Sequence, residues 1–190
     1  FSTEDAERLA KRRLPRLVFD FVQGAAGREV SAARNVAAFD TVMLQPRVMA
    51  DVGQCSLAME LMGQSYEVPF GIAPMGMCNL VHPKADASLA NAAKAMDFPM
   101  CLSSAASTSI EDMARMAGLH AWFQLYFGGS QEASLAMVER AQIAGYETLI
   151  LTVDVPQVSR RVRDLRNGFT VPFAMTPRAF WDFATHPSWS

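Results

Sequence analysis

Polar side chains directly follow four short apolar runs in the middle of the chain, and these side chains could do chemistry. The runs cover residues 69–73, 99–102, 122–126 and 148–153, and the polar positions at their ends are Pro74-Met75-Gly76, Ser103-Ser104, Gln124 with Tyr126, and Thr152 with Asp154. Hydroxyl and amide groups can donate and accept hydrogen bonds, and a carboxylate can orient a catalytic base. A loop that begins at a strand end explains any one of these positions. Polar residues at the ends of four successive runs favour a binding site.

The elements that must position these residues form an alternating pattern. Helix-like stretches lie near residues 85–96, 109–117 and 130–144, between the apolar runs. Fully apolar strands separated by helices are typical of a parallel sheet, because each parallel crossover requires a dozen or more residues. The pattern predicts an α/β fold.

Two α/β arrangements fit this pattern, an open doubly wound sheet or a barrel. No G-x-G-x-x-G motif follows any of the four runs, which argues against a dinucleotide-binding open sheet. Barrel enzymes place their chemistry at the carboxyl ends of the strands, where the polar residues gather here. Because such a barrel has eight strands in roughly 250 residues, we predict the N-terminal half of a (β/α)8 TIM barrel.

The segment before the barrel is predicted to be helical. Ser2 and Asp5 form a capping pattern for a helix that extends to about Arg13, Pro15 can open a second helix, and a third covers residues 29–39. A short hairpin is expected at residues 56–64. The predicted organisation is therefore residues 1–67 as N-terminal helices and hairpin, 68–154 as the first four barrel strands, and 155–190 as a loop.

Composition excludes several classes of function. The chain has 190 residues, 51% of them hydrophobic, and a net charge of −2, so no basic field for nucleic acid is present. The three cysteines include no C-x-x-C pair, which predicts neither a disulfide framework nor a metal site and favours a reducing compartment. The charged residues 1–13 lack the apolar region of a secretory signal. We expect a cytoplasmic protein.

Several segments, taken in order along the chain, resemble the FMN-dependent α-hydroxy-acid dehydrogenase and oxidase family, which includes mandelate dehydrogenase. They are Leu14-Pro15-Arg16 with Phe19-Asp20-Phe21, Ile72-Ala73-Pro74-Met75-Gly76, Leu102-Ser103-Ser104, Trp122-Phe123-Gln124-Leu125-Tyr126, and Leu151-Thr152-Val153-Asp154 leading to Arg160-Arg161. Each segment alone is weakly specific, whereas the ordered set is strongly specific.

The resemblance implies a division of labour among these residues. The backbone of Ala73, Pro74, Met75 and Gly76 would lie against the flavin ring of FMN, and Ser103, Gln124 and Thr152 would hydrogen-bond its polar edge. Tyr126 would direct its hydroxyl at the substrate, Asp154 would orient a catalytic histidine, and Arg161 would bind the substrate carboxylate. A solvated loop arginine, a core tyrosine and a helix-capping aspartate are the structural alternatives. None of His82, His120 and His186 matches the family's base, and we expect all three in loops or at the surface.

The substrate pocket departs from the usual pattern at Phe21, where many members carry a tyrosine. Gly76 and Ala105 occupy positions beside the substrate side chain, and small residues there leave room. This pairing resembles mandelate-type enzymes and favours a bulky or aromatic (S)-2-hydroxy acid, with electrons passed to a quinone-like acceptor. An oxygen-using oxidase or a lactate dehydrogenase of the same family is the alternative. A non-catalytic half-barrel that serves as an interaction subunit is the alternative from another class.

The predicted loop ends in a segment rich in aromatic residues. Residues 173–190 contain Phe173, Phe180, Trp181, Phe183 and Trp189. Aromatic residues with basic neighbours suit peripheral contact with the inner membrane face, whereas a lid over the active site or packing on the barrel explains the same composition. The resemblance also implies a homo-oligomer.

Overall fold

The computed structural model describes residues 2–127, 129–154, 157, 159–171, 173–187 and 189. Positions 155, 156, 158, 172, 188 and 190 of the predicted 155–190 loop lie outside the described residues. The chain forms two compact units, one of residues 1–50 with 155–190 and one of residues 51–154. The hairpin therefore belongs with the sheet, and the C-terminal segment belongs with the N-terminal helices.

The first unit is helical. Its elements are α1 (Thr3–Arg13), α2 (Arg16–Gln23), α3 (Val30–Ala38), the 3-10 helix η1 (Phe39–Thr41), α8 (Val162–Asn167) and α9 (Pro177–Ala184). The predicted capping pattern is present, because the Ser2 hydroxyl accepts from the Asp5 amide at 3.3 Å and the Asp5 carboxylate accepts from the Ser2 amide at 3.1 Å. The three predicted N-terminal helices are confirmed to within a residue or two at their ends.

The start of α2 is capped from the other end of the chain. Pro15 precedes this helix and offers no side-chain acceptor. The Asp182 carboxylate, on α9, accepts from the amides of Arg16 at 3.1 Å and Leu17 at 3.0 Å. These bonds satisfy two amides that an α-helix leaves free at its N-terminus. They also fix α9 to α2, within a segment for which the sequence predicted no long helix.

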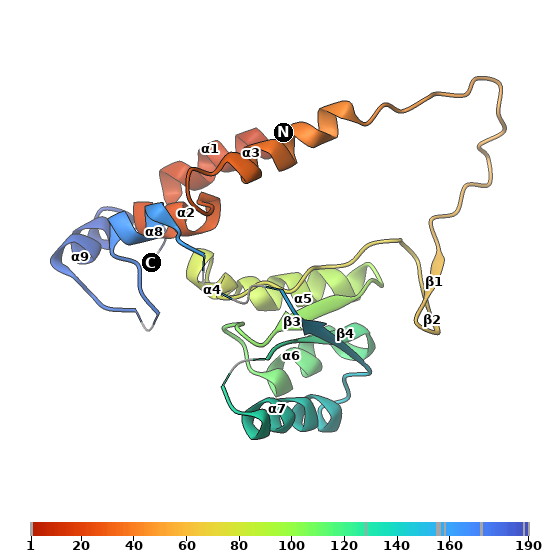
Figure 1. The fold of residues 1–190 in the computed structure, drawn as a ribbon. Helices are drawn as coiled ribbons and strands as arrows, with labels where there is room; N and C mark the ends of the chain where they lie inside the picture. Colours follow the sequence, from red (N-terminus) through yellow and green to blue (C-terminus); the bar gives the residue numbers. More distant parts are fainter. Residues whose placement is uncertain are drawn as a thin grey trace. The chain divides into compact units, whose positions relative to one another are not determined.

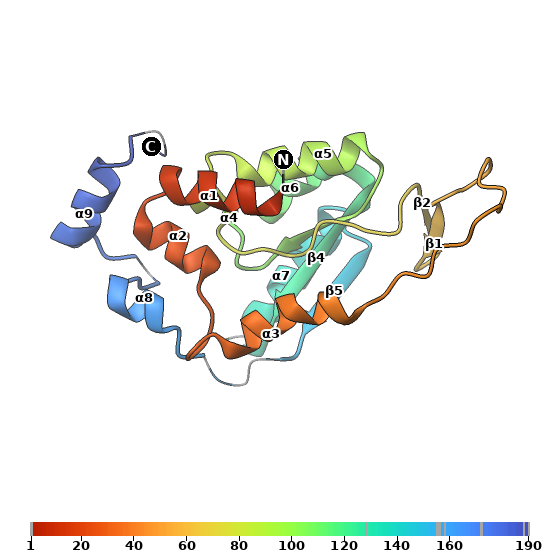
Figure 2. The ribbon, with the colours of Figure 1, turned by 90° about the horizontal axis from the view of Figure 1, so that it is seen from above.

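The second unit is built on a parallel sheet. Strands β3 (Met100–Ser103), β4 (Ala121–Tyr126) and β5 (Thr148–Thr152) lie in chain order, all parallel. The helices of this unit are α4 (Cys78–Val81), α5 (Ala85–Ala95), α6 (Ile110–Ala117), η2 (Gly118–His120) and α7 (Gln131–Ile143). Helices α6 and α7 lie on one side of the strands (Figure 1). Leu102, Met113 and Phe123 lie in the core between sheet and helices. The predicted alternation of strands and helices is confirmed, and β4 and β5 run side by side in the view from above (Figure 2).

The first predicted strand, residues 69–73, is not a regular strand. It joins the sheet by one parallel bridge between Ile72 and Met100, supported by a bond from the Ile72 amide to the Pro99 carbonyl at 2.9 Å. Pro69 and Pro74 flank the run, and proline cannot donate a ladder hydrogen bond. The run nevertheless occupies the place of a strand beside β3.

The hairpin lies slightly later in the chain than predicted. It pairs β1 (Met59–Leu61) with β2 (Gln64–Tyr66) in antiparallel fashion. Met62 and Gly63 form the turn, and both have positive φ, of 56° and 80°. Two central residues with positive φ match the right-handed twist of a two-residue hairpin.

Candidate functional site

A hydrogen-bonded row of polar side chains crosses the carboxyl end of the sheet. The Ser103 hydroxyl donates to the Gln124 amide oxygen at 2.9 Å, and the Gln124 amide nitrogen donates to the Thr152 hydroxyl at 2.7 Å. Gln124 is 1% exposed and Ser103 is 4% exposed. Because side chains alternate across a strand and neighbouring strands are in parallel register, these three residues lie on one face of the sheet. The structure thus brings together three predicted cofactor-binding residues.

The row leaves hydrogen-bonding capacity for a ligand. A glutamine amide has two N–H donors and two acceptor lone pairs, and the row uses one of each on Gln124. The Thr152 hydroxyl accepts from Gln124 and retains its own hydrogen for another acceptor. The Ala105 amide donates to the Ser103 oxygen at 3.1 Å, which fixes the first member of the row. A neutral, planar heterocycle with alternating donors and acceptors matches such a set.

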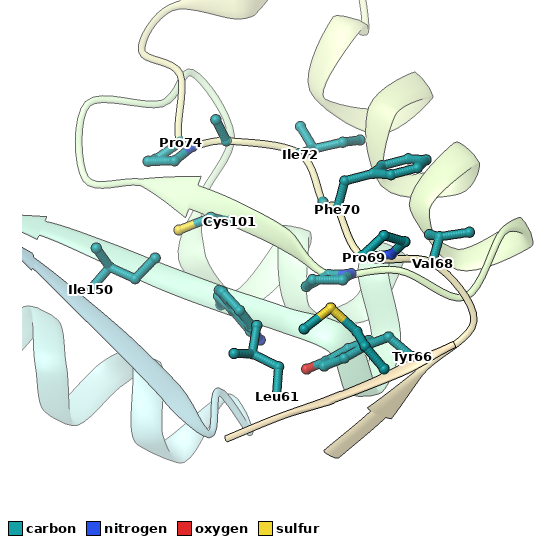
Figure 3. Close-up of a pocket in the computed structure, with 14 residues that line it drawn as sticks. Leu61, Tyr66, Val68, Pro69, Phe70, Ile72, Pro74, Cys101 and Ile150 are labelled. Atoms are coloured by element: carbon teal, nitrogen blue, oxygen red, sulfur yellow. The ribbon is translucent and has the colours of Figure 1, made fainter. Parts of the chain in front are cut away.

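An apolar cavity lies on the same face, toward the start of the strands. Cys101, Trp122 and Ile150 precede the three polar residues by two positions each and line a cavity of about 240 Å³. Figure 3 shows Cys101 and Ile150 among the lining residues, with the hairpin residues Leu61 and Tyr66 at the opposite end of the cavity from Pro74. The face therefore has an apolar floor and a polar rim, as expected for the interior and mouth of a barrel.

Two loops lie next to each other at the polar rim. A Cβ placed on Gly76 would lie 3.2 Å from both the Cβ and the carbonyl oxygen of Ala105. The Met77 amide donates to the same carbonyl at 3.1 Å. The close approach requires a small residue at position 76. The predicted substrate-pocket residues Gly76 and Ala105 are thus adjacent.

Tyr126 and Asp154 lie beyond the buried row. Tyr126 ends β4 and is 49% exposed, and its amide donates to the Ser104 hydroxyl at 3.1 Å. Asp154 follows β5 and is exposed. Tyr126 therefore lies at the carboxyl end of its strand, and Asp154 lies two residues past the end of β5.

Arg161 and Phe21 lie together in the first unit. The guanidinium carbon of Arg161 is 5.2 Å from the centroid of the Phe21 ring. Its Nη2 donates to the Phe21 carbonyl and, at 3.0 Å, to the Gly24 carbonyl. Nε forms an ion pair with Asp164 at 2.7 Å. A Cβ on Gly24 would lie 2.5 Å from the Asp20 carbonyl oxygen. Only glycine therefore fits the turn that presents the Gly24 carbonyl to Arg161.

These contacts orient the guanidinium, and the ion pair with Asp164 balances part of its positive charge. Arg163, two positions later, forms ion pairs with Glu29 and Asp20. The hydrogen bond to Glu29 is the main cause of the raised pKa of Arg163, and the same bond is the main cause of the lowered pKa of Glu29. The resemblance identified Arg161 and Phe21, but the Asp164 partner was missed. Asp164 could have been noticed only as a carboxylate three positions after Arg161.

Cys78 and Cys101 offer no nucleophile, because their thiols are protonated at neutral pH. Burial raises the pKa of the Cys101 thiol to about 12, and burial together with the Asp86 carboxylate raises that of Cys78 to about 11, so both thiols stay protonated at neutral pH. His82 is exposed beside α4, and His120 bonds to Asp97 at 2.8 Å away from the polar row. Within the described ranges, no group of three His, Cys, Asp or Glu residues could hold a metal ion.

The fold defines a class of protein, namely the N-terminal half of a parallel α/β barrel, and the polar row lies at the carboxyl ends of its strands. The model of the family described as FMN-dependent dehydrogenase matches residues 10–190. The chain belongs to this family.

Curated relatives and a solved structure support the assignment. The chain is 39% identical over 187 residues to a putative L-lactate dehydrogenase of Mycobacterium tuberculosis, covering 98% of this chain and 45% of the relative. It is 37% identical over 190 residues to (S)-mandelate dehydrogenase of Pseudomonas putida, covering 100% of this chain and 48% of the relative. The crystal structure of the monotopic membrane protein (S)-mandelate dehydrogenase superposes with a TM-score of 0.92 at 37% identity, covering 100% of this chain and 50% of that chain. The chain spans about half the length of these relatives, and the half-barrel prediction is confirmed.

Proposed function

We propose that this chain forms the flavin-facing half of an FMN-dependent enzyme that oxidises a 2-hydroxy acid to a 2-oxo acid. The observation that carries the proposal is the hydrogen-bonded row Ser103–Gln124–Thr152 at the carboxyl end of the sheet. Ser103 and Gln124 are buried, and the bonds within the row leave donors and acceptors of Gln124 and Thr152 unused. These groups fit the polar edge of a flavin, because a neutral heterocycle needs hydrogen bonds more than counter-charges. When bound, FMN supplies the acceptor for the two electrons removed from the substrate.

The remaining roles fall to exposed groups at the carboxyl ends of the strands and to Arg161. The Arg161 guanidinium is held by the Phe21 and Gly24 carbonyls and by Asp164, and its Nη1 group would donate to the substrate carboxylate. The Tyr126 hydroxyl would stabilise charge on the reacting oxygen of the substrate. Asp154 would orient the histidine that removes a proton, and that histidine lies outside the residues of this chain.

We propose a bulky (S)-2-hydroxy acid such as mandelate as the substrate. In the second unit, Gly76 and Ala105 keep the loop junction free of large side chains. In the first unit, the apolar Phe21 ring lies against the Arg161 guanidinium. Mandelate dehydrogenase is the activity printed for one relative, and L-lactate dehydrogenase for another. The pocket residues favour the former.

The test is reduction of the flavin in the full-length gene product without oxygen. (S)-Mandelate should bleach the flavin rapidly and glycolate slowly, and the reverse order would refute the substrate assignment. Slow reoxidation in air, with rapid reoxidation by a quinone analogue, is expected for a dehydrogenase. Rapid reoxidation in air would instead indicate an oxidase.

Arg161→Met tests the carboxylate-binding role. Loss of a charge-assisted hydrogen bond should raise KM for mandelate by roughly 10- to 100-fold, on the order of 1.5–3 kcal/mol. Arg166→Met, an exposed arginine in α8, is the matched control and should leave KM unchanged. Equal kinetics of Arg161→Met and the wild-type protein would remove the assigned role.

A second proposal concerns peripheral attachment to a membrane through α9. Phe180 and Trp181 are 63% and 71% exposed on this helix, and Met175 just before it is 60% exposed. Among the described residues, no helix is long and apolar enough to cross a membrane. Aromatic residues at a helix face suit the lipid interface, and a related structure is named a monotopic membrane protein. Phe180→Ser with Trp181→Ser should abolish cosedimentation with phosphatidylglycerol vesicles, whereas unchanged cosedimentation would refute this contact.

A further inference from the structure

A buried polar cluster lies outside the residues assigned to cofactor and substrate. Asp86, in the first turn of α5, is 2% exposed, and its carboxylate accepts from the Thr108 hydroxyl at 2.8 Å. The Asn79 amide nitrogen donates to the Thr108 oxygen at 3.4 Å, and the Asn79 oxygen accepts from the Asp86 amide at 3.1 Å. The three residues therefore form a closed triangle of hydrogen bonds.

The triangle joins segments that are distant in sequence. Asn79 lies in α4, which directly follows the loop of Gly76, and Thr108 lies in the loop that begins at Ala105. The same two loops are joined a second time by the bond from the Met77 amide to the Ala105 carbonyl at 3.1 Å. Two connections, one at each end, fix the separation of the two loops.

Placing the Asp86 carboxylate in this buried position costs free energy. Burial of a charged group costs free energy that its partners only partly recover, and apolar residues of similar volume often give equal or greater stability. The Thr108 hydroxyl and the N-terminus of α5 offset part of the cost for Asp86. Such a group adds geometric specificity that an apolar contact lacks.

We infer that Asp86 is a positioning residue, which acts through Thr108 to set the separation of Gly76 and Ala105 and thereby the width of the pocket for the substrate side chain. The inference rests on the proposed function, because that proposal places Gly76 and Ala105 beside the substrate side chain. It assigns substrate selectivity to residues that do not touch the substrate.

The test uses Thr108→Val in the full-length, FMN-loaded protein. Valine keeps the shape of threonine but removes the hydroxyl that Asp86 binds. The ratio of kcat/KM for (S)-mandelate to that for (S)-lactate should fall about 10-fold, and exchange of the Met77 amide hydrogen should become at least 10-fold faster. Thr108→Ser restores the hydroxyl and should keep both quantities within twofold of the wild-type protein.

Ser134→Ala is the matched control. Ser134, in α7, is 1% exposed, and its hydroxyl donates to the Ser130 carbonyl at 3.2 Å, away from both loops. Its loss should lower the melting temperature much as Thr108→Val does, with no change in the substrate ratio or in Met77 exchange.

The outcomes separate this inference from the proposed function. An unchanged substrate ratio in Thr108→Val, with a lowered melting temperature, would show a merely structural role and overturn the inference. Unchanged exchange at Met77 would overturn it as well. If the wild-type protein oxidises neither acid, the proposed function fails, and the exchange measurement still decides whether the cluster holds the two loops.

Discussion

Gln124→Leu removes the centre of the polar row while keeping the side chain close to its original size. Gln124 is 1% exposed and makes one hydrogen bond to Ser103 and one to Thr152. Leucine fills the space but can neither donate nor accept. The substitution therefore isolates hydrogen bonding from packing.

The magnitude follows from the bonds lost. A typical buried hydrogen bond contributes about 1 kcal/mol net, and each partner left unsatisfied costs about 1–3 kcal/mol. Ser103 keeps its bond from the Ala105 amide, so its penalty lies at the low end. The free energy of unfolding should fall by about 2–4 kcal/mol. Loss of the one or two bonds that Gln124 would make to FMN should weaken FMN binding about 10- to 100-fold, because 1.4 kcal/mol corresponds to a factor of ten.

The assay is quenching of FMN fluorescence on titration of the full-length apoprotein, with urea unfolding of the same samples. Ser134→Ala is again the control, since it removes a hydroxyl of equal burial and should leave FMN affinity unchanged. FMN affinity of Gln124→Leu within twofold of the wild-type value would refute the assignment of the row to the flavin, whatever the loss of stability.

Four further predictions concern other parts of the chain. Gly76→Ala should lower stability by about 1–3 kcal/mol, because the added Cβ would press on Ala105 at 3.2 Å; urea unfolding that matches the wild-type curve would contradict this. Asp182→Ala removes the cap of α2 and should cost about 1 kcal/mol, measured as a fall in the melting temperature, and an unchanged melting temperature would show that the cap is dispensable. Burial raises the pKa of Cys78 to about 11 and that of Cys101 to about 12, against an ordinary 9.0, so these thiols ionise first in the unfolded chain. Their contribution to stability should be constant well below pH 9 and should fall from pH 9 to about 11 for Cys78 and to about 12 for Cys101. Mass spectrometry after brief alkylation at pH 8 should find the label on the exposed Cys55, and equal labelling of all three would contradict the burial.

Much of the sheet could be predicted from sequence because buried parallel strands leave a strong pattern. Uniformly apolar runs separated by helical stretches indicate a sheet covered by helices, and the runs that contain Leu102, Phe123 and Ile150 became strands. The run at residues 69–73 has the same composition, but its flanking prolines reduce it to a single bridge. The apolar composition of a run therefore predicts its burial, whereas its pairing with a neighbouring strand depends on which residues have a backbone N–H to donate.

The residues of the polar row could be predicted from the sequence, but the hydrogen bonds that join distant segments could not. Strand ends and the family resemblance identified Ser103, Gln124 and Thr152, because parallel strands bring their carboxyl ends to one edge. Nothing in the sequence pairs Asp86 with Thr108, or Asp182 with the start of α2, since these contacts join segments 22 and more than 160 residues apart. Such contacts are set by tertiary packing, which local patterns do not record.

The most direct test of the central claim is a crystal structure of the full-length protein with FMN bound. The account predicts that the polar edge of the flavin lies within hydrogen-bonding distance of the Gln124 amide and the Thr152 hydroxyl, with the loop of residues 73–76 against the ring. A flavin bound elsewhere, with Ser103, Gln124 and Thr152 bonded only to one another, would contradict it.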